Sequence, residues 1–252
     1  EVAERKTQMS IAQLEAMPLF NRGSNSLKLN LLNTALTGII AEFKRQSPSK
    51  GIINDTASVA DVVNAYTKYG AAGISVLTDK TFFGGTIDDL SIAVKNPIPV
   101  LRKEFIIDEY QLIEAKAYGA SVILLIAACL TPNTTHALAK YAKSLGLEVL
   151  LEIHDATELG HISEAVDFVG INNRSLKSFD VNIEHSLELK HQLPKGILSI
   201  AESGIYSVET FNVLKKEGFD GFLMGEYFMK QADPAAAFEA FVTSIKTDNN
   251  AD

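Results

Sequence analysis

The sequence contains only one cysteine, Cys129, so no disulfide can form within the chain. Absence of internal disulfides fits a reducing compartment, and we expect a cytoplasmic protein. No apolar run is long enough to cross a bilayer, because the best candidates, 121–129 and 146–153, have the length of strands. The charged first residues lack the apolar stretch of a secretion signal. Cys129 follows an apolar run and is expected to be a small buried residue.

Positive charge is also scarce, since 23 lysines and arginines face 31 acidic residues and give a formal net charge of −8. This balance argues against nucleic acid as a partner, although a small anionic ligand responds to local charge. No glycine-rich dinucleotide motif or P-loop is present, and the five histidines lack metal-binding spacing. A mechanism based on a dinucleotide or ATP, or on a histidine-bound metal, therefore has no support in these patterns.

The 252 residues, 46% of them apolar, instead contain a short β-branched run, a polar loop and a helical stretch repeated eight times. The expected strands are 38–44, 73–77, 100–105, 121–126, 148–153, 168–171, 197–201 and 221–224. The clearest expected helices are 58–69, 133–145, 207–217 and 235–245. Strands that alternate with helices form a parallel sheet. Eight regular units favour an α/β fold that closes as a (β/α)8 TIM barrel; a doubly wound sheet is the alternative.

Residues 1–37 precede the first strand and are interpreted as an N-terminal helical extension; 38–252 would form the barrel, with one domain overall. The pattern predicts one helix near 2–16, followed by a loop through Pro18. Apolar Leu14 and Phe20, among others, should not stay exposed, so the extension is expected to pack on the barrel. Either a lid over the active site or an external stabilising cap fits this segment.

Polar residues gather where the expected strands end, which is where the chemistry of such barrels lies. Alternation puts Glu42 and Lys44 on one face of the first strand, either as a tuned acid–base pair or as a structural salt bridge. Lys103 and Phe105 share a face of the third strand, and this lysine is either a proton donor or a solvated side chain. Glu152 ends an apolar run, so we expect either a raised pKa suited to acid–base work or a cap interaction with the helix expected to follow.

The last three strands end in residues suited to an anionic substrate. Asn172 can donate and accept hydrogen bonds, and Arg174 either binds an anion or braces its loop. Glycine turns follow the seventh and eighth strands, where barrels bind phosphate through backbone N–H groups. These turns contain the pairs Ser203–Gly204 and Gly225–Glu226. His154 is expected to begin a helix.

Several segments, in order, resemble the family of indole-3-glycerol-phosphate synthases. The most specific is 39–51 (IIAEFKRQSPSKG). The others are 75–79 (SVLTD), 82–85 (FFGG), 101–106 (LRKEFI), 170–174 (GINNR) and 201–205 (AESGI). The resemblance spans about 38–241 and implies a decarboxylating lyase of tryptophan biosynthesis without a cofactor. Its reaction converts 1-(2-carboxyphenylamino)-1-deoxyribulose 5-phosphate to indole-3-glycerol phosphate, carbon dioxide and water. Association with other tryptophan-pathway enzymes stays open.

The resemblance also assigns roles to the residues at the strand ends. Lys103 matches the general acid of ring closure, and Glu152 matches the carboxylate that stabilises positive charge and assists dehydration. Lys44, oriented by Glu42, contacts the substrate, and which lysine acts in which step stays open. Asn172 would hold a substrate hydroxyl. The implied substrate-binding residues are Ser47, Phe83, Phe105, Leu124, Arg174, Leu176, Ser203, Gly204, Met224, Gly225 and Glu226.

Two positions depart from the family pattern. Glu104 replaces a common aspartate, and strand alternation points it away from Lys103, so we expect little effect. Glu226 replaces a serine found in some members, and a carboxylate beside phosphate is unfavourable unless its side chain points outward. Rival functions are a sister barrel, such as phosphoribosylanthranilate isomerase or a tryptophan synthase α subunit, and a non-catalytic phosphate-binding barrel.

Overall fold

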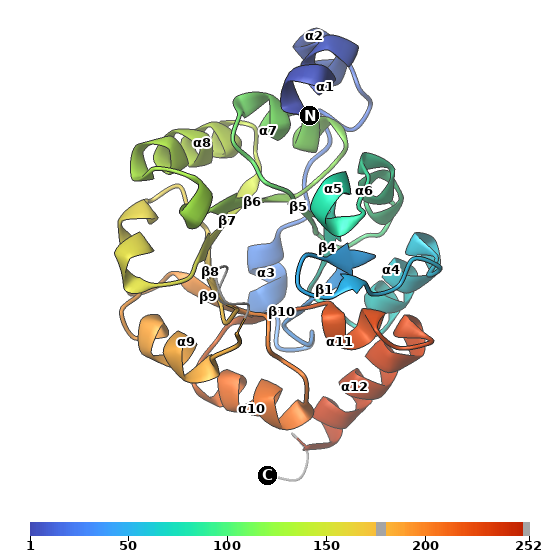
Figure 1. Ribbon diagram of the computed structural model, residues 1–252, viewed down its shortest axis with the longest axis vertical. Coiled ribbons are helices and arrows are strands. Elements are labelled where there is room, and N and C mark those ends of the chain that lie inside the picture. Colours follow the sequence, from blue (N-terminus) through green and yellow to red (C-terminus); the bar gives the residue numbers. More distant parts are fainter. Residues whose placement is uncertain (175–179, 249–252) are drawn as a thin grey trace.

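The computed structural model describes residues 1–174 and 180–248, and its central feature is a closed barrel of eight parallel strands (Figure 1). The barrel strands are β1 (Ile39–Phe43), β4 (Gly73–Leu77), β5 (Val100–Lys103), β6 (Val122–Ile126), β7 (Glu148–Ile153), β8 (Phe168–Asn172), β9 (Leu198–Glu202) and β10 (Gly221–Met224). Each pairs with its sequence neighbour, and β1 closes the barrel by pairing with β10. The prediction of a barrel is confirmed, and a doubly wound sheet is wrong.

Helices surround the strands in a ring, as Figure 1 shows. The longer ones are α4 (Val59–Lys68), α6 (Ile87–Ala93), α7 (Glu109–Ala117), α8 (Pro132–Ser144), α9 (Ile183–Lys190), α10 (Val208–Lys216) and α12 (Pro234–Asp248). Short helices α5 (Lys80–Phe83) and α11 (Glu226–Met229) and a hairpin of β2 (Gln46–Ser47) and β3 (Gly51–Ile52) lie in the loops. Serine side chains cap two of these helices, since Ser58 accepts a hydrogen bond from the Asp61 backbone N–H and Ser207 from that of Thr210.

Two apolar layers hold the barrel together, and strand alternation separates them. One cluster fills the barrel interior and includes Ile40, Leu101, Leu150 and Ile200. The larger cluster lies between strands and helices and includes their neighbours in the chain, such as Ile39 and Ala201. Side chains at the end of an inward-facing row therefore project into the mouth of the barrel.

Two local expectations are wrong. Cys129 ends the 3₁₀ helix η1 (Ala127–Cys129) and is exposed, because the strand ends at Ile126 and the chain turns outward. His154 begins no helix, since Asp155 caps the following 3₁₀ helix η2 (Ala156–His161) by accepting from the Thr157 backbone N–H. The His154 imidazole instead lies next to Glu152.

The N-terminal segment also differs from the single helix expected near 2–16. It forms α1 (Val2–Gln8) and α2 (Ile11–Glu15), because Ser10 and Gln13 make a capping box that starts a second helix. A third helix, α3 (Leu27–Leu32), occupies part of the expected loop region.

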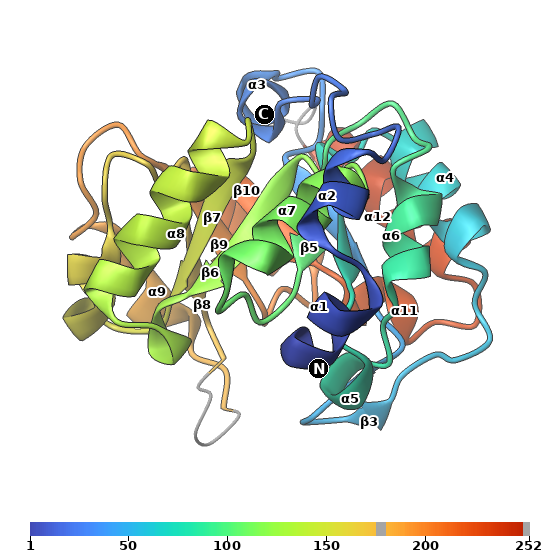
Figure 2. The same cartoon turned by 90° about the horizontal axis from the view of Figure 1, so that it is seen from above.

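Figure 2 shows α3 at one end of the barrel and α1 toward the other, with α2 beside α7 on the outside. Leu27 of α3 is buried in the interior cluster and Leu31 packs against it, while Glu148 at the start of β7 accepts hydrogen bonds from Ser26 Oγ and the Leu27 N–H at 2.5 and 2.7 Å. Leu14 of α2 instead packs against α7 on the outside. Neither a lid nor an external cap therefore describes the whole segment. Within the described ranges, no helix is long and apolar enough to span a bilayer.

Candidate active site

A pocket opens at the carboxyl ends of the strands, and every predicted site residue within the described ranges lines it. Leu176 lies outside the described residues. The predicted residues lining the pocket are Glu42, Lys44, Ser47, Phe83, Lys103, Phe105, Leu124, Glu152, Asn172, Arg174, Ser203, Gly204, Met224, Gly225 and Glu226. They lie on six barrel strands or in the loops that follow the eight strands, so barrel closure brings together residues far apart in the sequence.

Two lysines share one buried carboxylate at the centre of the pocket. Lys44 Nζ lies 2.9 Å from Glu42 Oε1, and Lys103 Nζ lies 3.2 Å from Glu42 Oε2. Burial opposes ionisation of Glu42, but the ammonium groups of Lys103 and Lys44 outweigh it and lower the Glu42 pKa to about 2. The predicted Glu42–Lys44 pair therefore extends to Lys103, and Glu42 stays ionised at neutral pH.

Lys103 also contacts a second carboxylate, with its Nζ 3.4 Å from Glu202 Oε2. Burial favours the neutral amine, but the negative charge of Glu42 outweighs it and raises the Lys103 pKa. Lys103 is thus held as an ammonium group, the form that can donate a proton. It is a partly buried member of the pocket and not a solvated side chain.

The expectation that Glu152 has a raised pKa is wrong. Its side chain accepts a hydrogen bond of 3.0 Å from Asn172 Nδ2 and lies 3.3 Å from His154 Nε2. Burial opposes ionisation, but the close contact with His154 and the charge of Lys103 lower the Glu152 pKa. The same contact raises the His154 pKa to about 10, although burial opposes protonation. The sequence around Glu152 did not reveal Lys103, which comes from β5, whereas His154 lies only two positions further along the chain.

Glu202 is the carboxylate with the raised pKa, and the sequence reasoning gave it no role. It is fully buried at the end of β9, and burial and the negative charge of Glu152 raise its pKa. Gly170 of β8 makes room for it, because a Cβ on Gly170 would lie 2.0 Å from Glu202 Oε1. Glu202 therefore retains a proton near neutral pH. Strand alternation could have identified Glu202. It lies two positions after the inward-facing Ile200, just as Glu152 lies two positions after the inward-facing Leu150.

An apolar wall lies beside the charged centre. The Phe105 ring packs against Phe82 and Phe83, with centroids 5.8 and 6.1 Å apart, and Leu124 belongs to the interior cluster below. Met224 lines the pocket but its side chain packs in the outer layer, while its neighbour Leu223 belongs to the interior cluster. The wall is thus suited to one face of an aromatic ring.

The turns after β9 and β10 need glycine at particular places. Ser203 and Gly204 have φ of 63° and 76°, and a Cβ on Gly204 would lie 2.4 Å from Val181 Cγ1. A Cβ on Gly225 would lie 2.7 Å from Glu42 Oε1, so this glycine lets the backbone approach the charged centre. Asn173 Nδ2 donates to the Ser203 carbonyl oxygen at 2.8 Å and holds the first turn.

Glu226 lines the pocket and pairs with Arg174, its Oε2 lying 2.9 Å from Arg174 Nη2, so its carboxylate does not point away from the site. Arg174 also donates to Ser49 Oγ at 2.7 Å and to the Tyr206 hydroxyl at 2.9 Å, two pocket residues that the sequence reasoning missed. The guanidinium offsets the charge of Glu226 beside the two turns. Arg174 therefore braces its loop and still brings positive charge to the pocket.

This arrangement combines ammonium groups, paired carboxylates, an apolar wall and glycine turns at the carboxyl ends of barrel strands. Among residues 1–174 and 180–248, no His, Cys, Asp and Glu side chains gather in a group that could hold a metal ion. The fold and site define an α/β-barrel enzyme that performs acid–base chemistry.

The family model described as "Indole-3-glycerol phosphate synthase" matches residues 1–241. Proteins of that name from Bacteroides thetaiotaomicron and an Exiguobacterium species are 45% and 47% identical to this chain. The first alignment covers 98% of this chain and 95% of the relative, and the second covers 87% and 88%. The chain belongs to the indole-3-glycerol phosphate synthase family of decarboxylating lyases, which confirms the resemblance found in its sequence.

Solved structures of other barrels are similar in fold. A tryptophan synthase α subunit from Legionella pneumophila aligns with a TM-score of 0.64 at 15% identity, covering 89% of this chain and 99% of that one. The 3-hexulose-6-phosphate synthase of Salmonella typhimurium aligns with a TM-score of 0.63 at 14% identity, covering 83% and 98%. These low identities support the barrel architecture alone.

Proposed function

We propose that this pocket converts 1-(2-carboxyphenylamino)-1-deoxyribulose 5-phosphate to indole-3-glycerol phosphate, carbon dioxide and water. The observation that carries the proposal is the position of Lys103, an ammonium group held between Glu42 and Glu202 at one end of the Phe105 wall. The wall suits the substrate's aromatic ring, and the glycine turns suit its phosphate. The ketone between those two parts of the substrate would then lie near the lysine.

Lys103 is proposed to supply the proton for ring closure. The ring carbon that carries the carboxylate attacks the ribulose ketone carbon, and the ketone oxygen takes a proton from the Lys103 ammonium group as the C–C bond forms. A positioned acid of this kind typically contributes about 10²–10⁴-fold to the rate. Glu42 fixes the ammonium through its Oε2 while holding Lys44 through Oε1, so both lysines reach the substrate in a set geometry.

Glu152 is proposed to act in the later steps. Loss of carbon dioxide returns the electron pair of the broken C–C bond to the ring and restores its aromaticity. Water then leaves from the former ketone carbon, and the adjacent CH₂ loses a proton to form the indole double bond. Glu152 is ionised and can stabilise positive charge or accept that proton, while its partner Asn172 is placed to hold a substrate hydroxyl. Either lysine can protonate the departing hydroxyl.

A fluorescence assay tests the proposed reaction directly. We expect the purified protein to convert the carboxyphenylamino substrate to a product with indole fluorescence, with one carbon dioxide released per indole formed. Phosphoribosylanthranilate, offered separately, should not be consumed. A protein that binds the first substrate without releasing carbon dioxide would be a non-catalytic barrel, and turnover of phosphoribosylanthranilate alone would assign it to the sister isomerase.

Phosphate is expected to bind between Ser203–Gly204 and Gly225–Glu226. Backbone N–H groups next to glycine can approach an anion closely, and Arg174 adds positive charge while its pairing offsets Glu226. A crystal soaked in inorganic phosphate should show the anion between these two turns. A Glu226→Gln variant should bind phosphate at least as tightly, because it removes a like charge. Phosphate found elsewhere, with both turns empty, would contradict this assignment.

A further inference from the structure

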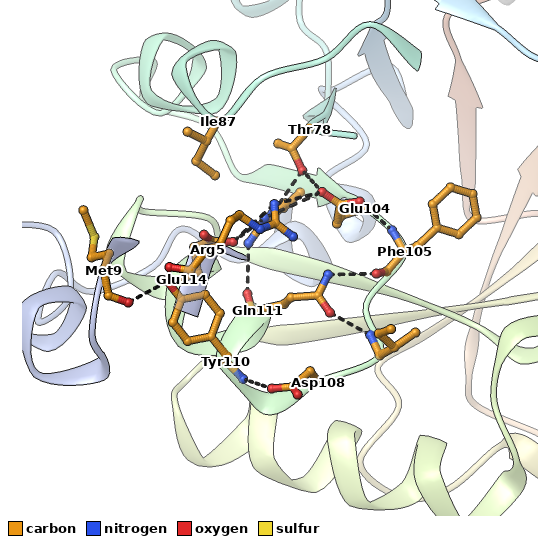
Figure 3. Close-up of polar contacts among 12 residues, drawn as sticks. Arg5, Met9, Thr78, Ile87, Glu104, Phe105, Asp108, Tyr110, Gln111 and Glu114 are labelled. Carbon is orange, nitrogen blue, oxygen red and sulfur yellow. Dashed lines mark hydrogen bonds and ion pairs between the residues drawn. The ribbon is translucent and has the colours of Figure 1, made fainter. Parts of the chain in front are cut away.

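Helix α1, which lies outside the barrel, brings a charged side chain to the end of β5. Arg5 Nη1 lies 3.6 Å from Glu104 Oε2 and 3.7 Å from Glu114 Oε2 (Figure 3). Glu104 directly follows Lys103, and Glu114 lies on α7; both carboxylates are buried. The Tyr110 hydroxyl holds the end of α1 by donating to the carbonyl oxygens of Arg5 and Met9 at 3.1 and 2.9 Å.

Charge balance explains why this contact matters. Inside the barrel wall, the fully buried Arg102 faces the same two carboxylates, with Nη2 2.6 Å from Glu114 Oε2 and 3.7 Å from Glu104 Oε2. One guanidinium cannot neutralise two carboxylates, so without Arg5 a buried negative charge would be left uncompensated. An uncompensated buried charge is costly, and its surroundings shift or admit water to relieve it.

Glu104 connects this charge cluster to the pocket through hydrogen bonds. Its Oε1 accepts a hydrogen bond of 3.0 Å from the Phe105 backbone N–H, and its Oε2 accepts one of 2.8 Å from Thr78 Oγ1. Gln111 Nε2 donates to the Phe105 carbonyl oxygen at 2.8 Å, so both backbone polar groups of Phe105 are held (Figure 3). Phe105 forms the apolar wall of the pocket. Glu104 thus contacts both the outer wall of the barrel and the backbone of a pocket residue.

We propose that Arg5 is a positioning residue: by neutralising the buried Glu104–Glu114 pair it keeps Glu104 on the Phe105 N–H and so holds the aromatic wall of the substrate pocket. The expected change in KM rests on the proposed function, whereas the effect of Arg5 on the Phe105 backbone does not. A wall that contacts the substrate ring before and during the reaction contributes uniform binding, so its displacement raises KM more than it lowers kcat.

The test compares Arg5→Met with Lys6→Met. Lys6 lies on the same helix and pairs with Asp108 at 2.7 Å on the exposed surface, so its variant removes an ion pair of α1 that does not touch Glu104. We expect Arg5→Met to raise KM for the carboxyphenylamino substrate by about three- to tenfold with kcat nearly unchanged, as is typical of a coupled network. Lys6→Met should leave both constants near the wild-type values.

A double variant separates charge from packing. Arg5→Met combined with Glu114→Gln again leaves one carboxylate for Arg102, so we expect KM to return to near the wild-type value. Arg5→Lys, which keeps the positive charge, should also raise KM less than Arg5→Met does. If Arg5→Met does not fold, Arg5→Lys and the double variant carry the comparison. No recovery in the double variant, or a lowered melting temperature with unchanged KM, would overturn the proposal.

Amide hydrogen exchange at Phe105 provides a readout that does not depend on the reaction. The Phe105 N–H should exchange faster in Arg5→Met than in the wild type and Lys6→Met, since its acceptor Glu104 is no longer fixed. Equal exchange in all three proteins would contradict the proposal. Faster exchange in a protein without turnover would mean that the proposed function had failed while the positioning contact stood.

Discussion

We expect Lys103→Met to lower kcat by at least about 10²-fold, the loss typical when a general acid is removed. Methionine matches much of the length of lysine but has no proton to donate, so the ketone oxygen would develop negative charge without compensation. The fold should survive, because Glu42 keeps Lys44 at 2.9 Å and the raised pKa of Glu202 lets that carboxyl group stay neutral. Steady-state kinetics by indole fluorescence measure the effect.

Lys143→Met is the matched control for this variant. Lys143 pairs with Asp167 at 2.7 Å on the exposed outside of the barrel, so the same substitution there tests the general effect of losing a lysine. Its kcat should stay near the wild-type value, since surface ion pairs contribute little. Near-normal turnover by folded Lys103→Met, with a melting temperature like that of the control, would remove Lys103 from the mechanism.

We also expect Glu152→Gln to lower kcat by at least about 10²-fold, for a different reason. Glutamine can still accept the hydrogen bond from Asn172, but it can neither stabilise positive charge nor accept a proton. The substitution also changes its neighbour, because loss of the Glu152 charge lowers the Glu202 pKa and allows Glu202 to ionise beside Lys103. KM should change less than kcat, since the missing interactions belong to the later chemical steps.

Glu148→Gln, at the opposite end of the same strand, is the control. Glu148 holds α3 through Ser26 and Leu27, so its loss should lower the free energy of unfolding by about 1–3 kcal/mol. Its kcat should stay near the wild-type value, because the amino ends of barrel strands serve stability and the carboxyl ends serve chemistry. A Glu152→Gln variant that only lost stability, as this control should, would contradict the proposed role of Glu152.

Local periodicity made much of the site predictable. Side chains alternate along a strand, so Glu42 and Lys44, or Lys103 and Phe105, had to share a face wherever those strands formed. Parallel strands present their carboxyl ends at one edge, and the structure indeed places these residues in one pocket. Strand alternation likewise places Glu202 on the inward face of β9, although the sequence analysis did not include it in the predicted site.

The N-terminal segment marks one limit of local reasoning. Its apolar residues showed that it must pack somewhere, but hydrophobicity has no direction and does not name a partner. Leu27 packs in the barrel interior and Leu14 against α7, at places set by the surfaces that barrel closure leaves uncovered. The capping box at Ser10 was readable from the sequence, yet the apolar spacing across it suggested one continuous helix.

The sequence by itself determined the eight strands, their inward-facing rows and the residue types at the mouth, because these depend on neighbours within a few positions. The tertiary structure alone decided which carboxylate keeps its proton. That choice depends on Lys103 of β5 lying close to Glu152 and on burial of Glu202 beside the same carboxylate. It likewise decided the contact of Arg5 with Glu104. Electrostatic energies depend on distances through space and on burial, and both are fixed only when the barrel closes.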